Sequence, residues 1–236
     1  MKIGLLTCDH MDEELRVTFG DHPDFFNNLF QKYAPQVSLD IFDVQKEEYP
    51  ENKNDYLGYI CTGSRFSVYD DVPWIRRLRA FINDLYDNHI KFVGICFGHQ
   101  MIAEALGGTC SLSNNGWGIG VKKAVIHKKP PWINPKLDSY NLLVSHRDQI
   151  EALPPGGVVI AGNDHCPYSM ITVGDHFLGI QGHPEFTHPF LKDLMQSRLD
   201  LMGREAVSQA EKTLGRKTDE AVVARWIVNF INGMEA

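Results

Sequence analysis

A cysteine stands between two glycines at the point where an apolar run gives way to a helical pattern. Cys96 follows the run 91–95, and Gly94 and Gly98 flank it in a G-x-C-x-G pattern. This spacing is typical of a nucleophile elbow, a turn so sharp that only glycine fits two residues before and after. It predicts a sulfur at the carboxyl end of the sheet, at a helix N-terminus that favours the reactive thiolate. The N–H of Phe97 would then point to the place where an oxyanion develops.

A histidine and a glutamate that could serve this cysteine occur two residues apart. A strand pattern ends at Gly182 and is followed by His183, Pro184 and Glu185. In an extended segment such side chains project to the same side, and Pro184 helps to keep the backbone extended. A carboxylate beside an imidazole fixes its tautomer and stabilises its protonated form, so the pair predicts an oriented base.

Each motif has a simpler alternative when it is taken alone. Cys96 could be a buried structural cysteine, because free cysteine is often buried. His183 and Glu185 could form an ordinary surface pair, or they could bind a metal together with His188. The spacing differs from H-E-x-x-H and Pro189 follows His188 directly, so we predict no metal site.

The elements that must position these residues follow from the apolar pattern. Strand patterns alternate with helical patterns in the first half of the chain, which is typical of a mostly parallel sheet covered on both faces. Helical spacing is found over 24–33 and 73–88, and a closing helix is predicted to begin near 218–220. The predicted strands are 2–7, 37–44, 56–62, 91–95, 121–126, 141–144, 158–161 and 177–181.

We therefore predict an α/β protein with an open, doubly wound, mostly parallel sheet. Short strands with turn residues over 121–181 indicate a smaller antiparallel extension, and helical patterns follow as a tail. The predicted organisation is one domain over 1–188, with a helical extension over 189–236 packed on it. The acidic segment 9–24 either borders the mouth of the active site or is a solvated connection.

Bulk composition excludes several classes of protein. The 236 residues carry a net charge of −7 and show no basic patch for phosphates, so we predict no nucleic-acid partner. No run of about eighteen apolar residues occurs, so we predict no membrane partner. The 5 cysteines form no C-x-x-C motif and the apolar N-terminal run is too short for a signal peptide, which predicts a cytoplasmic protein. Neither a P-loop nor a dinucleotide fingerprint occurs, so we predict no cofactor.

The two motifs, in this order and at this separation, resemble those of the class I (triad-type) glutamine amidotransferases. The resemblance covers roughly 2–186 and implies a flavodoxin-like fold with Cys96, His183 and Glu185 as a catalytic triad. It also implies an oxyanion hole formed by the loop around Gly63 and by the N–H of Phe97. The substrate contacts that it implies are Gln100, Ser145 and His146.

The implied chemistry is acyl transfer through a γ-glutamyl thioester on Cys96, and three functions fit it. The first is a glutaminase similar to the amidotransferase part of GMP synthase, with an ammonia-accepting synthetase as its partner. The second is a free-standing γ-glutamyl peptidase that acts on glutathione-like small molecules. The third is a non-catalytic regulatory module, against which the complete triad argues, because nothing structural requires a strained elbow there.

Overall fold

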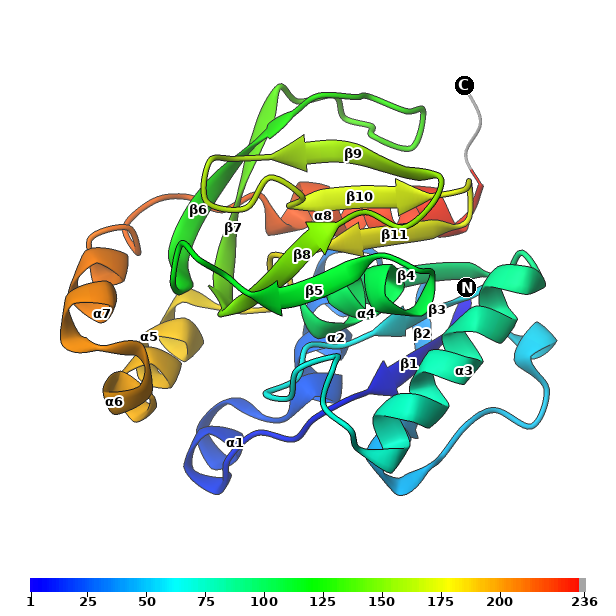
Figure 1. Cartoon of the computed structure of the whole chain (residues 1–236), viewed down its shortest axis with the longest axis horizontal. Helices are drawn as coiled ribbons and strands as arrows, with labels where there is room; N and C mark the ends of the chain where they lie inside the picture. The colour runs from blue at the N-terminus through cyan, green and yellow to red at the C-terminus, as the bar shows by residue number, and fades with distance from the viewer. Residues whose placement is uncertain (234–236) are drawn as a thin grey trace.

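The computed structural model describes residues 1–233, which form a large twisted sheet with helices on both faces (Figure 1). Residues 234–236 of the predicted C-terminal extension lie outside the described part. The parallel half of the sheet consists, in spatial order, of β2 (Ser38–Asp43), β1 (Lys2–Thr7), β3 (Gly58–Cys61), β4 (Lys91–Ile95) and β11 (Phe177–Ile180).

An antiparallel half continues the same sheet beyond β11. Its strands are, in order, β10 (Met170–Val173), β9 (Gly157–Gly162), β6 (Gly118–Ile126) and β7 (Ser139–His146). A separate ladder pairs β5 (Thr109–Leu112) with β8 (Asp148–Ala152). The carboxyl ends of β4 and β11 lie side by side, so the chain that follows each strand emerges at the same edge of the sheet.

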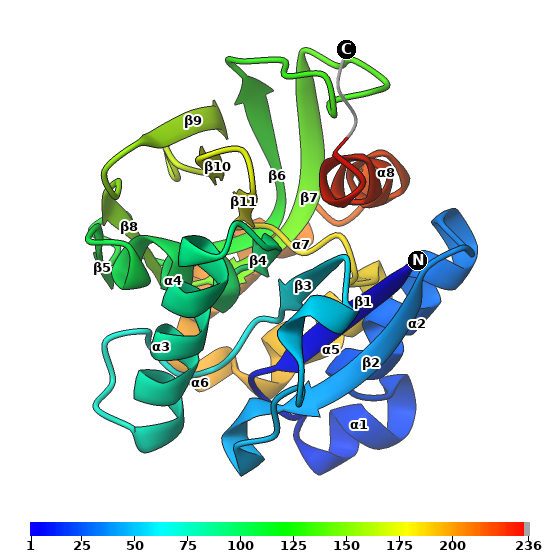
Figure 2. The same cartoon turned by 90° about the vertical axis from the view of Figure 1, so that its right-hand side faces the viewer.

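The parallel half is covered on both faces, as Figure 2 shows when the sheet is seen from its side. Helices α2 (His22–Tyr33) and α8 (Glu220–Ile231) bury Phe26, Phe30 and Trp226 against one face. Helices α3 (Pro73–Asp87) and α4 (Phe97–Ala105) bury Leu78 and Met101 against the other face. Burial of apolar side chains on both faces is the main source of stability for such a sheet.

Four further helices complete one end of the molecule. These are α1 (Glu13–Phe19), α5 (His188–Ser197), α6 (Leu199–Met202) and α7 (Arg204–Glu211). Leu15 of α1, Phe190 and Leu194 of α5 and Met202 of α6 share one apolar cluster with residues of β6 and β7. Two 3₁₀ turns, Val44–Lys46 and Lys53–Asp55, lie between β2 and β3.

The predicted fold class is confirmed, with a parallel central part, an antiparallel extension and a helical tail. The segment 9–24 is not a simple connection, because it contains α1 and the first turn of α2. Helix α1 was not predicted, because only Leu15 of its 7 residues is buried and the segment therefore has little apolar helical pattern. Strands β5, β8 and β10 were not predicted: β8 is mostly polar, β5 buries only Cys110, and β10 was missed although it is apolar. No helix of residues 1–233 has the length and apolarity needed to span a bilayer.

Candidate active site

Cys96 occupies the sharp turn between β4 and α4. Its φ of 52° and ψ of −100° lie in a region that residues other than glycine rarely adopt. A Cβ on Gly94 would lie 2.2 Å from the carbonyl oxygen of Gly98, and a Cβ on Gly98 would lie 2.6 Å from that of Cys61. Both glycines are therefore required by close backbone packing, and the turn has the geometry of a nucleophile elbow.

His183 and Glu185 follow the end of β11, beside the elbow. The backbone N–H of His183 donates to the carbonyl oxygen of Leu143 over 2.8 Å, which ties this segment to β7. Its Nδ1 lies 2.7 Å from Oε1 of Glu185, and both side chains are buried. The imidazole also lies flat on the ring of Phe186. The ring of His183 is thus held at one edge and on one face.

The charge of His183 is set by its two neighbours. Burial lowers the pKa of His183, but the attraction of Glu185 and of Cys96 outweighs burial and raises the pKa to about 10. The imidazole is therefore protonated near neutral pH, and it can donate a proton to a departing group. An imidazolium next to a cysteine also stabilises the thiolate, which is the nucleophilic form.

Gly63 faces both of these side chains from the end of β3. A Cβ on Gly63 would lie 3.0 Å from Cε1 of His183 and 3.6 Å from Cβ of Cys96. Within 1–233, neither the N–H of Gly63 nor that of Phe97 donates to a protein acceptor. Two unused N–H groups beside one sulfur are the arrangement that an oxyanion hole needs.

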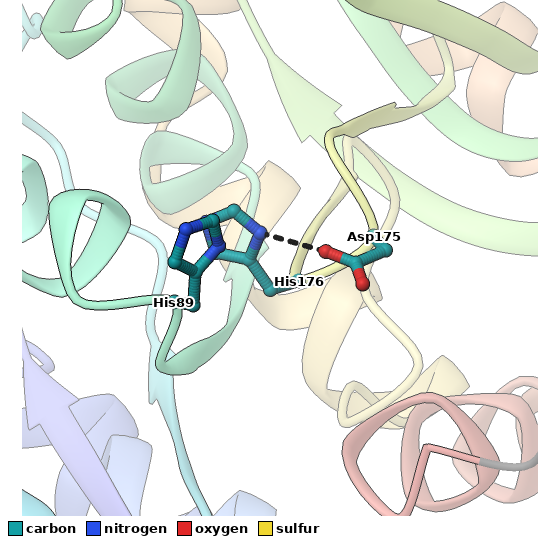
Figure 3. A group of neighbouring side chains, drawn as sticks. All are labelled: His89, Asp175 and His176. Carbon is teal, nitrogen blue, oxygen red and sulfur yellow. Dashed lines mark hydrogen bonds and ion pairs between the residues drawn. The ribbon is translucent and has the colours of Figure 1, made fainter.

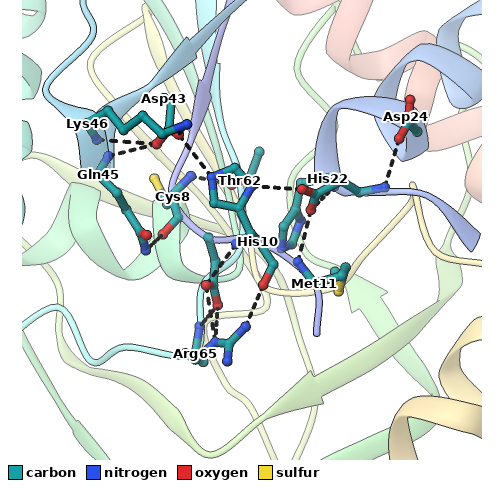
Figure 4. A network of polar contacts seen from close by, with 12 residues as sticks. Cys8, His10, Met11, His22, Asp24, Asp43, Gln45, Lys46, Thr62 and Arg65 are labelled. Carbon is teal, nitrogen blue, oxygen red and sulfur yellow. Dashed lines mark hydrogen bonds and ion pairs between the residues drawn. The ribbon is translucent and has the colours of Figure 1, made fainter. Parts of the chain in front are cut away.

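A carboxylate after β1 holds the loop that contains Gly63. Asp9, which is buried, accepts a hydrogen bond from the backbone N–H of Arg65 over 2.8 Å and another from its Nε over 2.9 Å. Nη1 of Arg65 donates to the exposed Asp12 over 2.9 Å. The guanidinium of Arg65 is therefore neutralised by its own surroundings, and its place in the network is visible in Figure 4.

His10 continues this network away from the elbow. Its Nδ1 lies 2.7 Å from Asp21 and its Nε2 lies 3.0 Å from Asp43 (Figure 4). Burial lowers the pKa of His10, but these two carboxylates outweigh burial and raise it. The ring links the N-terminus of α2 to the end of β2. His22, the first residue of α2, is buried, and burial lowers its pKa to about 4.

Gln100 lies in the first turns of α4 and lines the cleft next to Cys96. Its Nε2 donates to the carbonyl oxygen of Asp148 over 2.8 Å and to Oε1 of Gln181 over 3.1 Å. Both amide donors are thus used inside the protein. A substrate contact of Gln100 would therefore have to use its Oε1 as an acceptor.

Ser145 and His146 are the last residues of β7, and Asp148 begins β8. Both residues line the same cleft as Cys96. The hydroxyl of Ser145 is buried without a partner within 1–233, and it remains free for a ligand. Burial lowers the pKa of His146 to about 3, so that its ring is neutral, with Nδ1 3.1 Å from the carbonyl oxygen of Asp148.

The cleft beside Cys96 has a volume of about 380 Å³, which is within the range of small-molecule sites. Of the predicted site residues, Cys96, Gln100, Ser145 and His146 line this cleft, and Gly63 and His183 line a smaller cavity that Cys96 and Ser145 also line. Asp9 and His22 line a cavity with Cys96, so the segment 9–24 borders the site, as one of its two predicted roles required; Phe186 and Arg198, which line the same cavity, were not predicted. Two of these residues could have been suspected from the sequence, because Asp9 directly follows the first strand and Phe186 directly follows Glu185. The sequence around Arg198 does not indicate a role at the site, because Arg198 is positioned by the packing of helices α5 and α6.

His188 does not join His183 and Glu185, because its Nε2 contacts the carbonyl oxygen of Arg216 over 3.1 Å. Within the described residues, a cluster with spacing suited to a metal is formed by His89, Asp175 and His176 (Figure 3). Both ring nitrogens of His176 already have protein partners, Asp175 and the carbonyl oxygen of Tyr86. The cluster lies where β4 and β11 begin, opposite to Cys96.

Comparison with known proteins identifies the family of the chain. The family model "Glutamine amidotransferase class-I" matches residues 25–197. The chain is 30% identical to γ-glutamyl peptidase 3 of Arabidopsis thaliana, over 97% of this chain and 95% of that protein. It is 27% identical to a glutamine-hydrolyzing GMP synthase subunit of Methanoculleus marisnigri, over 69% of this chain and 84% of that protein.

A solved structure of a glutamine amidotransferase from Thermotoga maritima has the same fold. The TM-score is 0.74 at 20% identity, and the match covers 97% of this chain and 98% of that one. The match of the family model spans most of the chain, including the elbow and the His183–Glu185 pair. The chain is a member of the class-I glutamine amidotransferase family.

Proposed function

We propose that the chain is a cysteine-dependent amidohydrolase that cleaves γ-glutamyl amide bonds, with γ-glutamyl peptides as its substrates. The observation that carries the chemistry is the strained elbow of Cys96 beside the buried His183–Glu185 pair. The choice of peptides is supported by γ-glutamyl peptidase 3 of Arabidopsis thaliana, which matches this chain over nearly its full length, including the helical tail.

The geometry supports acyl transfer in two stages. The thiolate of Cys96 attacks the δ-carbonyl carbon, and the N–H groups of Gly63 and Phe97 bind the oxygen as it becomes negative. His183 donates its proton to the departing nitrogen, and the C–N bond breaks to leave a γ-glutamyl thioester. His183 then takes a proton from water, which attacks the thioester and releases glutamate. Glu185 holds the imidazole in position throughout.

Glutamine is the second candidate substrate. The glutamine-hydrolyzing GMP synthase relative from Methanoculleus marisnigri supports it, although that match covers 69% of this chain against 97% for the peptidase. In this case ammonia would pass to a separate synthetase. In both substrates the same γ-glutamyl C–N bond breaks and the same residues act on it. The two substrates differ only in the amine that departs.

Glutamate release by the purified protein tests the proposal. We expect turnover of γ-glutamyl dipeptides and of glutathione, slower turnover of glutamine, and loss of all of these with Cys96→Ser. Rapid quenching followed by mass spectrometry should detect a γ-glutamyl group on the peptide that contains Cys96. Turnover of glutamine alone would favour the synthetase-linked function, and full activity of Cys96→Ser would contradict the mechanism.

A further inference from the structure

Within residues 1–233, the guanidinium of Arg198 has no ion-pair or hydrogen-bond partner, and Arg198 lines the candidate active site from the helical tail. The backbone of Arg198 is fixed at the junction of α5 and α6, where its N–H donates to Leu194 over 3.2 Å and its carbonyl oxygen accepts from Met202 over 2.9 Å. Its side chain lines the cleft together with Cys96. Figure 1 shows α5 and α6 gathered with α1 at one end of the molecule.

Arg198 differs in its pairing from the other arginines of the cleft. Arg65 is held by Asp9 and Asp12, and Nε of Arg147 lies 3.9 Å from Asp148. Arg198 has neither an ion pair nor a side-chain hydrogen bond within 1–233. An arginine stays charged and offers five N–H donors in a planar fork that matches a carboxylate. Within 1–233, the donors of this guanidinium are therefore available to a ligand.

The position of Arg198 indicates which part of a substrate it would meet. A small cavity next to the elbow is lined by Cys96, His183 and Arg198, and Arg198 also lines the larger cleft, which Gln100 lines as well. The departing nitrogen must lie near His183, which protonates it. Because Arg198 shares the small cavity with His183 and Gln100 does not, we place the leaving group next to Arg198.

The surroundings of Arg198 also suit a peptide. Trp117 and Leu201 line the outer cleft beside it, and the side chain of Leu201 is 59% exposed. Apolar surface next to a cation accommodates an amino-acid side chain next to a carboxylate. Ammonia, the leaving group of glutamine, would use neither feature.

We propose that Arg198 is a specificity-determining residue that binds the free carboxylate of the leaving amino acid or peptide. The inference rests on the proposed γ-glutamyl hydrolase function and deepens it, because it selects γ-glutamyl peptides over glutamine. Arg198 contributes only to substrate binding, whereas Cys96 and His183 act on the bond that breaks.

Binding to a Cys96→Ala protein, which cannot turn over, separates this inference from catalysis. The probes are γ-glutamylglycine, which has the leaving-group carboxylate, and γ-glutamylglycinamide, which lacks it. By isothermal titration calorimetry we expect the acid to bind about 10- to 100-fold more tightly, as for a hydrogen-bonded charge. Arg198→Met should abolish this preference and Arg198→Lys should keep part of it. The matched variant Arg204→Met, at an exposed arginine of α7, should leave it unchanged.

Three outcomes would overturn the inference. These are equal binding of acid and amide, a preference that survives Arg198→Met, and an equal loss for acid and amide, which would instead place the glutamyl carboxylate on Arg198. Kinetics of the protein with Cys96 intact separate the two proposals. Normal hydrolysis with an acid-to-amide ratio that Arg198→Met does not change refutes only the role of Arg198. An acid preference in binding without any glutamate release refutes only the proposed function.

Discussion

The imidazole of His183 lies flat on the phenyl ring of Phe186, with centroids 3.9 Å apart and planes only 4° from parallel. Phe186 is itself packed against Phe25 and Phe190, so the surface on which the imidazole rests cannot shift freely. Glu185 holds the edge of the same ring. Glu185 and Phe186 therefore fix the ring of His183 at its edge and on its face. Replacing each of them should have a different measurable effect.

Replacing the stacking surface should lower activity more than stability. Phe186→Leu keeps an apolar side chain but removes the parallel contact, which is worth about 1 kcal/mol for an aromatic pair. Because His183 would then sample other orientations, we expect kcat to fall about 5- to 10-fold. Glutamate release from a γ-glutamyl dipeptide measures this. Phe81→Leu, on the remote helix α3, is the matched control and should keep wild-type kcat. A wild-type kcat in Phe186→Leu would contradict a positioning role.

The raised pKa of His183 predicts a particular dependence of stability on pH. The folded protein holds this proton up to about pH 10, whereas the unfolded chain releases it near 6.5. The resulting stabilisation is complete below pH 6.5 and is lost as the pH rises toward 10. Glu185→Gln removes the main attraction for the proton. We therefore expect the free energy of unfolding to fall less steeply with pH in this variant, by up to about 1.4 kcal/mol per pH unit.

Urea unfolding at several pH values between the two pKa values measures this slope. Glu205→Gln makes the same chemical change at an exposed position of α7 and should retain the wild-type slope. Comparing the variants cancels the contribution of other groups that titrate in this range. Identical slopes in Glu185→Gln and the wild type would mean that Glu185 does not retain the proton on His183.

The elbow should tolerate no side chain at Gly94. A methyl group there would meet the carbonyl of Gly98 at 2.2 Å, and backbone atoms cannot move aside as a side chain can. We expect Gly94→Ala to lower the free energy of unfolding by about 3 kcal/mol or more, the size of a severe steric defect. Gly215→Ala is the control, because a Cβ at Gly215 meets nothing within 4 Å. Equal stability of the two variants would show that the turn can relax.

The local parts of the site were predictable because their causes are local. The elbow requires glycine at Gly94 and Gly98 for packing within a few residues, and this requirement is visible as a motif. His183 and Glu185 are two residues apart in an extended segment, so their mutual contact also follows from spacing. The meeting of Cys96 with His183 could be expected from the resemblance to the family. It depends on β4 and β11 being neighbours, which neither strand specifies alone.

The remaining residues of the site arrive through packing of distant segments. Arg198 lies at the cleft because Leu194 and Met202, on either side of it, pack with α1 and β7. The sequence around Arg198 contains no pattern that predicts this position. Asp9 follows β1 and Arg65 follows β3. The two residues meet because these strands are paired in the sheet. Such contacts follow from the arrangement of elements, which hydrophobic periodicity leaves open.

The two carboxylates that bind Arg65 should differ in importance. Asp9 is buried and accepts from both the backbone and the side chain of Arg65, so Asp9→Asn would weaken the support of the Gly63 loop. We expect kcat to fall about 10-fold or more, as when an oxyanion donor is displaced. Asp12 is exposed, and an exposed ion pair contributes little, so Asp12→Asn should have a clearly smaller effect on kcat. Equal losses would show that the charge of Arg65, rather than the position of the loop, matters.

Gly63→Ala should separate catalysis from folding most cleanly. The added methyl group would lie 3.0 Å from Cε1 of His183 and 3.6 Å from Cβ of Cys96, in the space that the reacting carbonyl would occupy. Its neighbours are side-chain atoms, so the cost in stability should be below that of Gly94→Ala. We expect the free energy of unfolding to change by about 1 kcal/mol or less, while kcat/KM falls about 100-fold or more. Gly215→Ala again provides the control. An active Gly63→Ala enzyme would mean that the substrate carbonyl approaches Cys96 from another side, and the oxyanion site would then have to be sought away from Gly63.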